Sequence, residues 1–69
     1  MKYKIGELIE YISDSKRPEN DVGIITNIHN GSIFIKWKST YIVCYPLYSF
    51  VIENNKIKNY GGKWIHYEI

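Results

Sequence analysis

The chain has 69 residues, with nine basic and seven acidic side chains and a formal net charge of +2. This length allows a single domain, residues 1–69, and leaves no room for a second core. A protein that binds mainly by neutralising phosphates usually carries a larger basic excess, so the charge argues against a purely electrostatic binder of nucleic acid. Cys44 is the single cysteine, which excludes an internal disulfide and favours a reducing compartment.

The hydropathy pattern argues against a membrane function. No apolar run approaches the ~20 residues that a spanning helix needs. The segment 1–7, Met-Lys-Tyr-Lys-Ile-Gly-Glu, lacks the apolar stretch of a signal peptide. We therefore expect a cytoplasmic protein without a membrane partner.

The first part of the chain reads as one strand and one loop. Residues 4–12 contain apolar side chains on both faces and are entered through Gly6, so they predict a strand. Residues 13–21 are polar and rich in turn-forming residues. They predict a long exposed loop.

A hairpin follows, and it carries the strongest local pattern of the chain. Two runs of mostly β-branched residues, 22–28 and 32–38, flank Asn30 and Gly31. This dipeptide suits the two positive-φ positions of a type I′ turn, whose twist matches antiparallel strands. Ile33, Ile35 and Trp37 would share one face of the second strand, opposite Phe34 and Lys36.

The rest of the chain predicts short strands separated by turns. Residues 41–45 form a strand that ends at Pro46, because proline has no N–H for the ladder. A tight turn, or a single helical turn, covers 46–50. Residues 56–60 and 63–69 predict two further strands, separated by Gly61 and Gly62. The fold class is all-β, with five to six short antiparallel strands.

Several of these motifs together resemble small SH3-like β-barrels, with a layout similar to KOW and Tudor-type modules and to small phage proteins. The resemblance rests on four motifs, which cover residues 4–52. They are Gly6-Glu7-Leu8-Ile9, Gly23-Ile24-Ile25, the Ile33–Trp37 alternation and the Pro46-Leu47-Tyr48 turn. It implies a small barrel with residues 53–69 as a C-terminal strand extension. Members of this group bind peptides, methylated lysines, nucleic acids or folded proteins, so the resemblance alone names no partner.

Catalytic and metal sites are not expected. Cys44 could pair with His29 or His66 as nucleophile and base, but it lies in an apolar run, where cysteine usually acts as a small hydrophobe. The two histidines and one cysteine lack the close paired spacing of zinc sites. We expect no catalytic residue, no metal and no cofactor.

The aromatic residues provide the first candidate site, a docking surface for a protein. Large rings with few charges are typical of protein interfaces. The candidate anchors are Phe34, Trp37, Tyr41, Tyr45, Tyr48 and Trp64. Trp37 is also a core candidate, and core or core edge is the better interpretation for it, since it shares its face with two isoleucines. An aromatic cage for a methylated amine is a further alternative, but it needs a carboxylate, and Glu53 is the only acid between residues 38 and 60.

Lysines near aromatic residues provide the alternative site, a surface for RNA or DNA. Base stacking combined with phosphate attraction is how single strands are bound. The candidate residues are Lys36, Lys38, Lys56, Lys58 and Lys63. The competing explanation is that these lysines protect strand edges against aggregation.

The C-terminal segment needs a partner, because residues 60–69 alternate aromatic and polar side chains where termini are usually polar. It pairs either with its own barrel or with a second copy of the chain, as a homo-oligomer. Taken together, the sequence predicts a non-enzymatic binding module, an accessory protein of a phage or a bacterium. We expect it to work in the cytoplasm, the host cytoplasm if a phage encodes it, and to dock on a protein.

Overall fold

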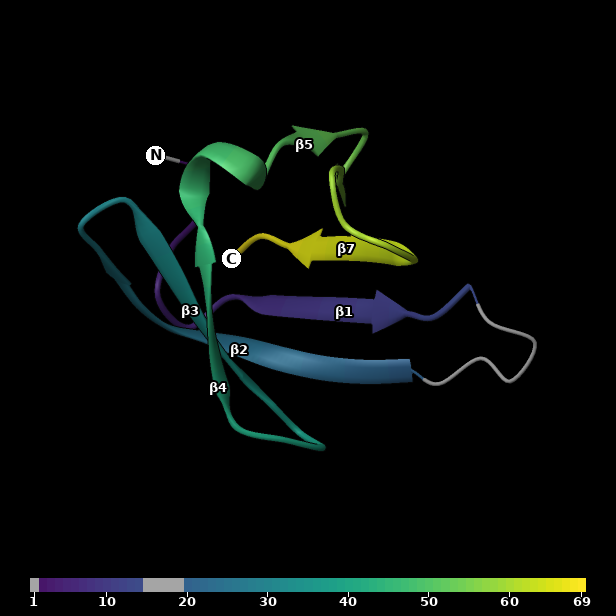
Figure 1. The fold of residues 1–69 in the computed structure, drawn as a ribbon, viewed down its shortest axis with the longest axis horizontal. Coiled ribbons are helices and arrows are strands. Elements are labelled where there is room, and N and C mark those ends of the chain that lie inside the picture. Colours follow the sequence, from purple (N-terminus) through teal and green to yellow (C-terminus); the bar gives the residue numbers. More distant parts are fainter. Residues whose placement is uncertain (1, 15–19) are drawn as a thin grey trace.

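The structure is a computed structural model that describes residues 2–14 and 20–69. Its described residues form one antiparallel sheet whose strands follow the order β4-β3-β2-β1-β7-β6-β5 (Figure 1). The strands are β1 (Leu8–Ile12), β2 (Asn20–His29), β3 (Ser32–Trp37), β4 (Ile42–Pro46), β5 (Ile52–Glu53), β6 (Lys56–Ile57) and β7 (Lys63–Tyr67). A 3-10 turn, η1 (Leu47–Ser49), connects β4 to β5. None of the described helical segments is long and apolar enough to cross a membrane.

The all-β class is therefore confirmed, and seven strands form where five to six were expected. The strand that was not expected, β5, forms a small hairpin with β6 across a turn at Asn54 and Asn55, and β6 covers only the first two residues of the strand predicted over 56–60. Both asparagines have positive φ, 52° and 61°. The short polar side chain of asparagine tolerates this conformation better than most residues.

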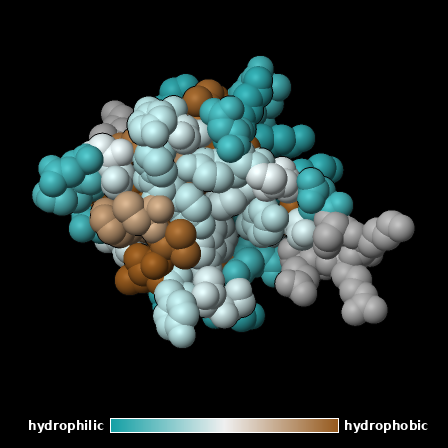
Figure 2. Space-filling model, viewed as in Figure 1, coloured by the Kyte–Doolittle hydropathy of each residue, from teal (hydrophilic) through white to brown (hydrophobic). Residues whose placement is uncertain are grey.

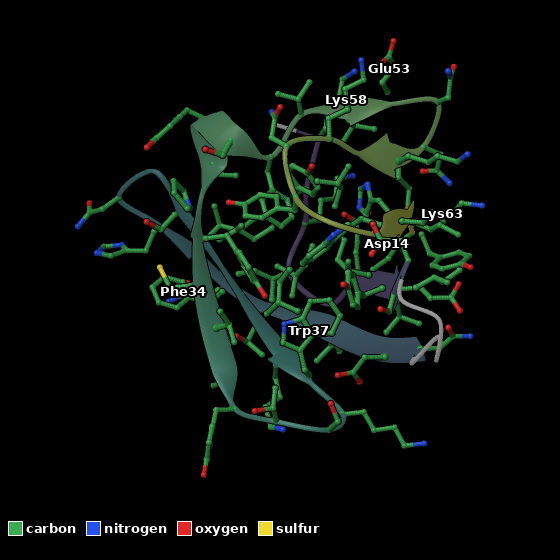
Figure 3. All side chains as sticks on the ribbon, turned by 45° about the vertical axis from the view of Figure 1, so that its right-hand side comes forward. Asp14, Phe34, Trp37, Glu53, Lys58 and Lys63 are labelled. Atoms are coloured by element: carbon green, nitrogen blue, oxygen red, sulfur yellow. The ribbon has the colours of Figure 1, made fainter. Side chains whose placement is uncertain are left out.

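The predicted hairpin at Asn30 and Gly31 is confirmed. Their φ angles are 49° and 74°, as a type I′ turn requires. On β3, Ile33 and Ile35 are fully buried and Trp37 is 4% exposed. Figure 3 shows Trp37 and Phe34 on opposite sides of the strand. The face assignment of this strand, and the place of Trp37 in the core, are confirmed.

The segment predicted as a loop, residues 13–21, is only partly one. Residues 15–19 lie outside the described part of the chain. Asn20 and Asp21, however, already belong to β2, where they pair with Ile12 and Tyr11 of β1. Neighbouring strand backbone thus overrides the turn preference of these two polar residues.

The C-terminal segment pairs within its own chain. β7 runs antiparallel to β1 over five residue pairs, from Leu8↔Tyr67 to Ile12↔Lys63. Its other side meets β6 through the pair Lys56↔Ile65. Both sides of β7 are therefore used in the chain, and a homo-oligomer through this strand stays a prediction that would require one of these pairings to open.

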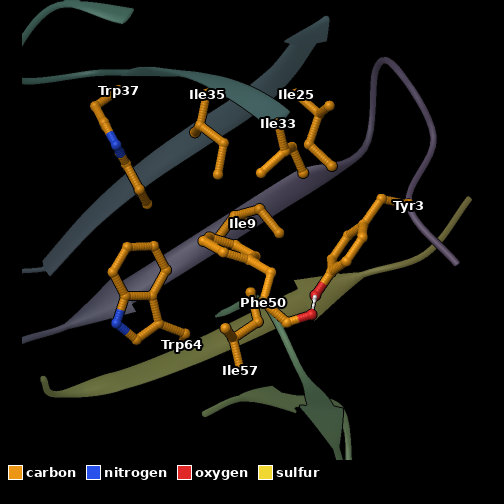
Figure 4. Packing of buried hydrophobic residues seen from close by; sticks show 9 residues of the cluster. All are labelled: Tyr3, Ile9, Ile25, Ile33, Ile35, Trp37, Phe50, Ile57 and Trp64. Carbon is orange, nitrogen blue, oxygen red and sulfur yellow. Dashed lines mark hydrogen bonds between the residues drawn. The ribbon is translucent and has the colours of Figure 1, made fainter. Parts of the chain in front are cut away.

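The sheet bends over a single core, which Figure 4 shows from close by. Its buried hydrophobic members are Tyr3, Ile9, Ile25, Ile33, Ile35, Trp37, Phe50, Ile57 and Trp64. The bend brings distant strands together, since the rings of Tyr45 on β4 and Trp64 on β7 have centroids 5.6 Å apart. No ladder joins β4 to β5 among the described residues, so the sheet is curled but not closed.

Candidate functional site

Aromatic side chains from four strands and one loop surround a hollow of about 300 Å³ at one end of the bent sheet. We call it the aromatic hollow. The rings that line it come from β1, β3, β4, the β6–β7 connection and β7, and they are Tyr11, Trp37, Tyr45, Tyr60 and Trp64. Asp21, Thr40, Val43 and Gly61 complete the lining.

Strand register explains why these side chains meet. Tyr11 is the cross-strand partner of Trp64 on one side and of Asp21 on the other. Side chains opposite each other on neighbouring strands share a face of the sheet, within about 5.5 Å at Cβ. One row of residues across β7, β1 and β2 thus forms one wall of the hollow.

Gly23 makes room for Trp37 in the same region. The two residues are cross-strand partners on β2 and β3. A Cβ atom at Gly23 would lie 2.8 Å from Cε3 of Trp37 and 2.4 Å from Cγ2 of Ile35. The absence of a side chain at residue 23 therefore lets the indole lie against the backbone of β2.

The rings pack edge to face. Centroids of Trp37 and Trp64 are 5.4 Å apart at an interplanar angle of 73°. Tyr11 meets Trp64 at 5.0 Å and 63°, and Tyr45 meets Tyr60 at 5.5 Å and 84°. Such arrangements place the positive edge of one ring against the negative face of the next, and each pair contributes roughly 0.5–1.5 kcal/mol beyond area burial.

Both indole N–H groups are engaged within the protein. Trp37 Nε1 donates to the Tyr45 hydroxyl at 2.9 Å, and Trp64 Nε1 donates to the Gly61 carbonyl at 2.7 Å. The polar atoms of the two indoles are therefore satisfied without a ligand. The two tryptophans can therefore contact a ligand through the faces and edges of their rings.

Asp21 supplies a carboxylate to the lining, which otherwise contains no acidic or basic side chain. Its Oδ1 accepts the Val22 N–H at 2.9 Å, and its Oδ2 accepts the Ser39 hydroxyl. Burial raises the pKa of Tyr45 above its ordinary value; the hydrogen bond from Trp37 opposes this shift, and electrostatic interactions with Tyr60 and Asp21 add to it. Asp21 therefore places a carboxylate in the same lining as the five rings.

The structure divides the six predicted aromatic anchors into two groups. Trp37, Tyr45 and Trp64 line the aromatic hollow, and both tryptophans are also core residues. The other three anchors do not line it. Tyr41 and Tyr48 are 84% and 86% exposed, and Phe34 lies half-buried on the opposite face of β3.

Sequence reasoning missed the other two rings of the site, Tyr11 and Tyr60, and its carboxylate, Asp21. Tyr11 shares the face of the buried Ile9, a parity that the sequence pattern already contains. Asp21 was assigned to a loop, and Tyr60 stands beside two glycines. The pairing of β1 with β2 places Asp21 beside Tyr11, and Tyr60 reaches the site through ring contacts with Tyr45 and Trp64.

The five predicted lysines are exposed and fall into two separate groups. Lys36 and Lys38 line a hollow with Tyr41, whereas Lys56, Lys58 and Lys63 line another around the β5–β6 hairpin. Two of the five are already engaged. Lys36 Nζ donates to the carbonyls of Trp37 and Thr40, both at 2.7 Å, and Lys58 forms an ion pair with Glu53.

The residues considered for nucleophilic catalysis are not placed together as a pair. Cys44 is exposed on β4, and His29 is exposed at the end of β2. His66 is fully buried, and its Nε2 lies 2.8 Å from Oε1 of Glu7. Within residues 2–14 and 20–69, no group of three His, Cys, Asp or Glu side chains is arranged to hold a metal ion.

Comparison of the chain with protein-family models, with curated proteins and with solved structures gives no match.

Proposed function

We propose that this chain is a non-enzymatic docking module with an SH3-like barrel layout, which binds a protein partner through the aromatic hollow. The strand order supports the layout. The segment between β1 and β2 takes the place of the long first loop, and a 3-10 turn follows β4. The strand that pairs with β1 comes last in the chain, after the inserted β5–β6 hairpin.

One observation carries the proposal: five aromatic rings and one carboxylate converge on a hollow whose lining has no basic side chain. Aromatic rings attract cations through their quadrupole, by roughly 0.5–2 kcal/mol according to how far the cation is desolvated. The charge of Asp21 adds to this attraction. We therefore propose that the hollow receives a cationic side chain of the partner.

The geometry favours a rounded alkylammonium group, as on lysine or methylated lysine, over a flat guanidinium. Both oxygens of Asp21 already accept hydrogen bonds inside the protein. The carboxylate is therefore better suited to attract a cation by its charge than to accept the two hydrogen bonds of a bidentate guanidinium contact. The rings stand at steep angles to one another. They form walls on several sides and no parallel slot for a planar group.

A pull-down from nuclease-treated bacterial lysate tests the docking function. The proposal predicts that the wild-type chain captures a protein and that a chain with Asp21→Asn and Tyr60→Leu loses it. Tyr48→Leu is the matched control, because Tyr48 is 86% exposed and lies outside the hollow. Capture that survives the double substitution would contradict the proposal.

The nucleic-acid alternative keeps one supporting observation, the grouping of Lys56, Lys58 and Lys63 around a single hollow. It predicts an affinity for RNA or DNA that falls linearly with salt on logarithmic axes. It also predicts that substituting all three lysines with glutamine flattens the slope. An absence of binding at low salt would dismiss this alternative.

In cellular terms, we propose an accessory protein of a phage or a bacterium that acts in the cytoplasm. A single, exposed cysteine agrees with a reducing compartment.

A further inference from the structure

β4 forms one edge of the sheet, and half of its backbone groups point away from β3. Leu47 N–H donates to the Gly31 carbonyl at 2.8 Å, so Gly31 and Leu47 are directly hydrogen-bonded to each other. This contact determines which of the following residue pairs between β3 and β4 are hydrogen-bonded. Directly hydrogen-bonded pairs recur at every second residue of an antiparallel ladder. In the observed register they are Ile33↔Tyr45 and Ile35↔Val43.

The backbone groups of Ile42 and Cys44 consequently face the open edge. No strand among the residues that the structure describes pairs with that side of β4. Each of the two residues offers one N–H and one carbonyl at this edge, and Pro46 offers a carbonyl alone. Such a row is a template for pairing with another strand.

The edge lacks the charges that usually discourage such pairing. Residues 39–52 contain no Asp, Glu, Lys or Arg. Tyr41 is 84% exposed and Ile42 is 54% exposed, and Cys44 is exposed as well. Figure 2 shows hydrophobic atoms gathered over the region that β4 occupies in Figure 1.

The opposite edge of the sheet has the usual protection. β5 is two residues long, and one of them is Glu53, which forms an ion pair with Lys58. Short edge strands and edge charges both prevent sheets from adding to one another. The contrast singles out β4 as the edge that is built to accept a strand.

We infer that a second copy of this chain pairs with β4, antiparallel and across a two-fold axis near Val43. In this arrangement Ile42 lies opposite Cys44 of the second copy, and the free N–H groups of both copies form four hydrogen bonds. The uncharged edge is complementary to itself, because nothing on it repels an identical strand. An antiparallel pair of identical edges also closes as a dimer instead of extending into a fibre.

The dimer is expected to be weak. A pair of five-residue strands covers less than the roughly 1,200 Å² of a standard interface, which places it among transient contacts. Val43 and Tyr45 project to the other face of β4, where they line the hollow. Substitutions of Ile42 or Cys44 that weaken self-association would therefore leave the lining of the proposed docking site unchanged.

Sedimentation equilibrium up to millimolar protein tests the inference. We expect a reversible monomer–dimer equilibrium, and Ile42→Lys should raise its dissociation constant about tenfold, because two such sites per dimer are altered. Ile24→Lys is the matched control: Ile24 is 41% exposed on β2, away from the edge. It should leave the constant within about threefold. Cys44→Lys is a second edge variant, in case the first one does not fold.

Cys44 also allows the geometry to be probed directly, because it is the single cysteine. A short bis-maleimide should link two wild-type chains at Cys44 and should link few chains carrying Ile42→Lys. A wild-type protein that stays monomeric would overturn the inference. A dimer that resists both edge substitutions, or one that Ile24→Lys disrupts instead, would overturn it too.

Discussion

The ring of His66 and the carboxylate of Glu7 face each other at 2.8 Å, although 59 residues separate them in the chain. Both are buried, with exposed fractions of 0% and 2%. Glu7 also accepts the backbone N–H of Lys4 at 2.7 Å and that of Ile69 at 2.9 Å. One carboxylate therefore ties the turn before β1 to β7 and to Ile69, two residues beyond that strand.

Because of the contacts of Glu7, the stability of the fold should decrease at acid pH. Burial alone would raise the pKa of Glu7, but the hydrogen bonds from Ile69, His66 and Lys4 outweigh it, and the pKa is lowered from its ordinary value of 4.5. A carboxyl group whose pKa is lowered by folding stabilises the fold above its unfolded pKa. That stabilisation is lost as the pH falls through the folded pKa. We expect the melting temperature to fall as the pH drops below about 4.5.

Glu7→Gln isolates the contribution of this carboxylate. We expect the variant to lose about 2 kcal/mol of unfolding free energy at pH 7, because hydrogen bonds to a buried charged group are lost. The difference from wild type should shrink toward pH 3. Urea denaturation at both pH values measures it, and Glu10→Gln, three residues further along on β1 and half-buried, serves as control. A difference that is constant with pH would contradict this account.

Gly23 should not tolerate even alanine. The added Cβ would lie 2.4 Å from Cγ2 of Ile35 and 2.8 Å from the ring of Trp37, so the core must shift. Overpacking of this kind costs about 1–3 kcal/mol. Gly61→Ala is the control, since nothing lies within 4 Å of a Cβ there. Thermal unfolding of the two variants should show a lower melting temperature for Gly23→Ala alone.

The two groups of aromatic anchors should behave differently when they are truncated. Trp64→Ala removes a ring that is 6% exposed, and it should cost about 3–5 kcal/mol of stability. Tyr48→Ala removes one that is 86% exposed, and it should change stability by less than about 0.5 kcal/mol. Chemical denaturation monitored by circular dichroism distinguishes them. Equal losses at both positions would show that the burial described here is wrong.

Much of the fold was predictable because its signals are local. Alternation from Ile33 to Trp37 identifies both a strand and its buried face, and Asn30 with Gly31 identifies the turn before it. These features depend on side-chain parity and backbone preference, which neighbouring residues reveal. The same parity placed Trp37 in the core.

The candidate site was less predictable, because strands distant in sequence build it. Asp21 stands in a polar, turn-rich stretch of sequence that is typical of a loop, and only its pairing with Tyr11 places it beside the rings. Glu7 is one acid among seven, and its burial follows from a histidine near the other end of the chain. A sequence pattern does not show which residues of two distant strands pair with each other, so these contacts could not be predicted from it.

The central claim is that the aromatic hollow binds a cation. Titration of the ¹⁵N-labelled chain with the amide of N-acetyl-trimethyllysine, followed at the indole N–H signals of Trp37 and Trp64, tests it most directly. We expect saturable shifts, about tenfold weaker binding for Asp21→Asn, and little response to the neutral isostere with carbon in place of the charged nitrogen. Unchanged indole signals, or equal binding of the neutral isostere, would contradict the claim.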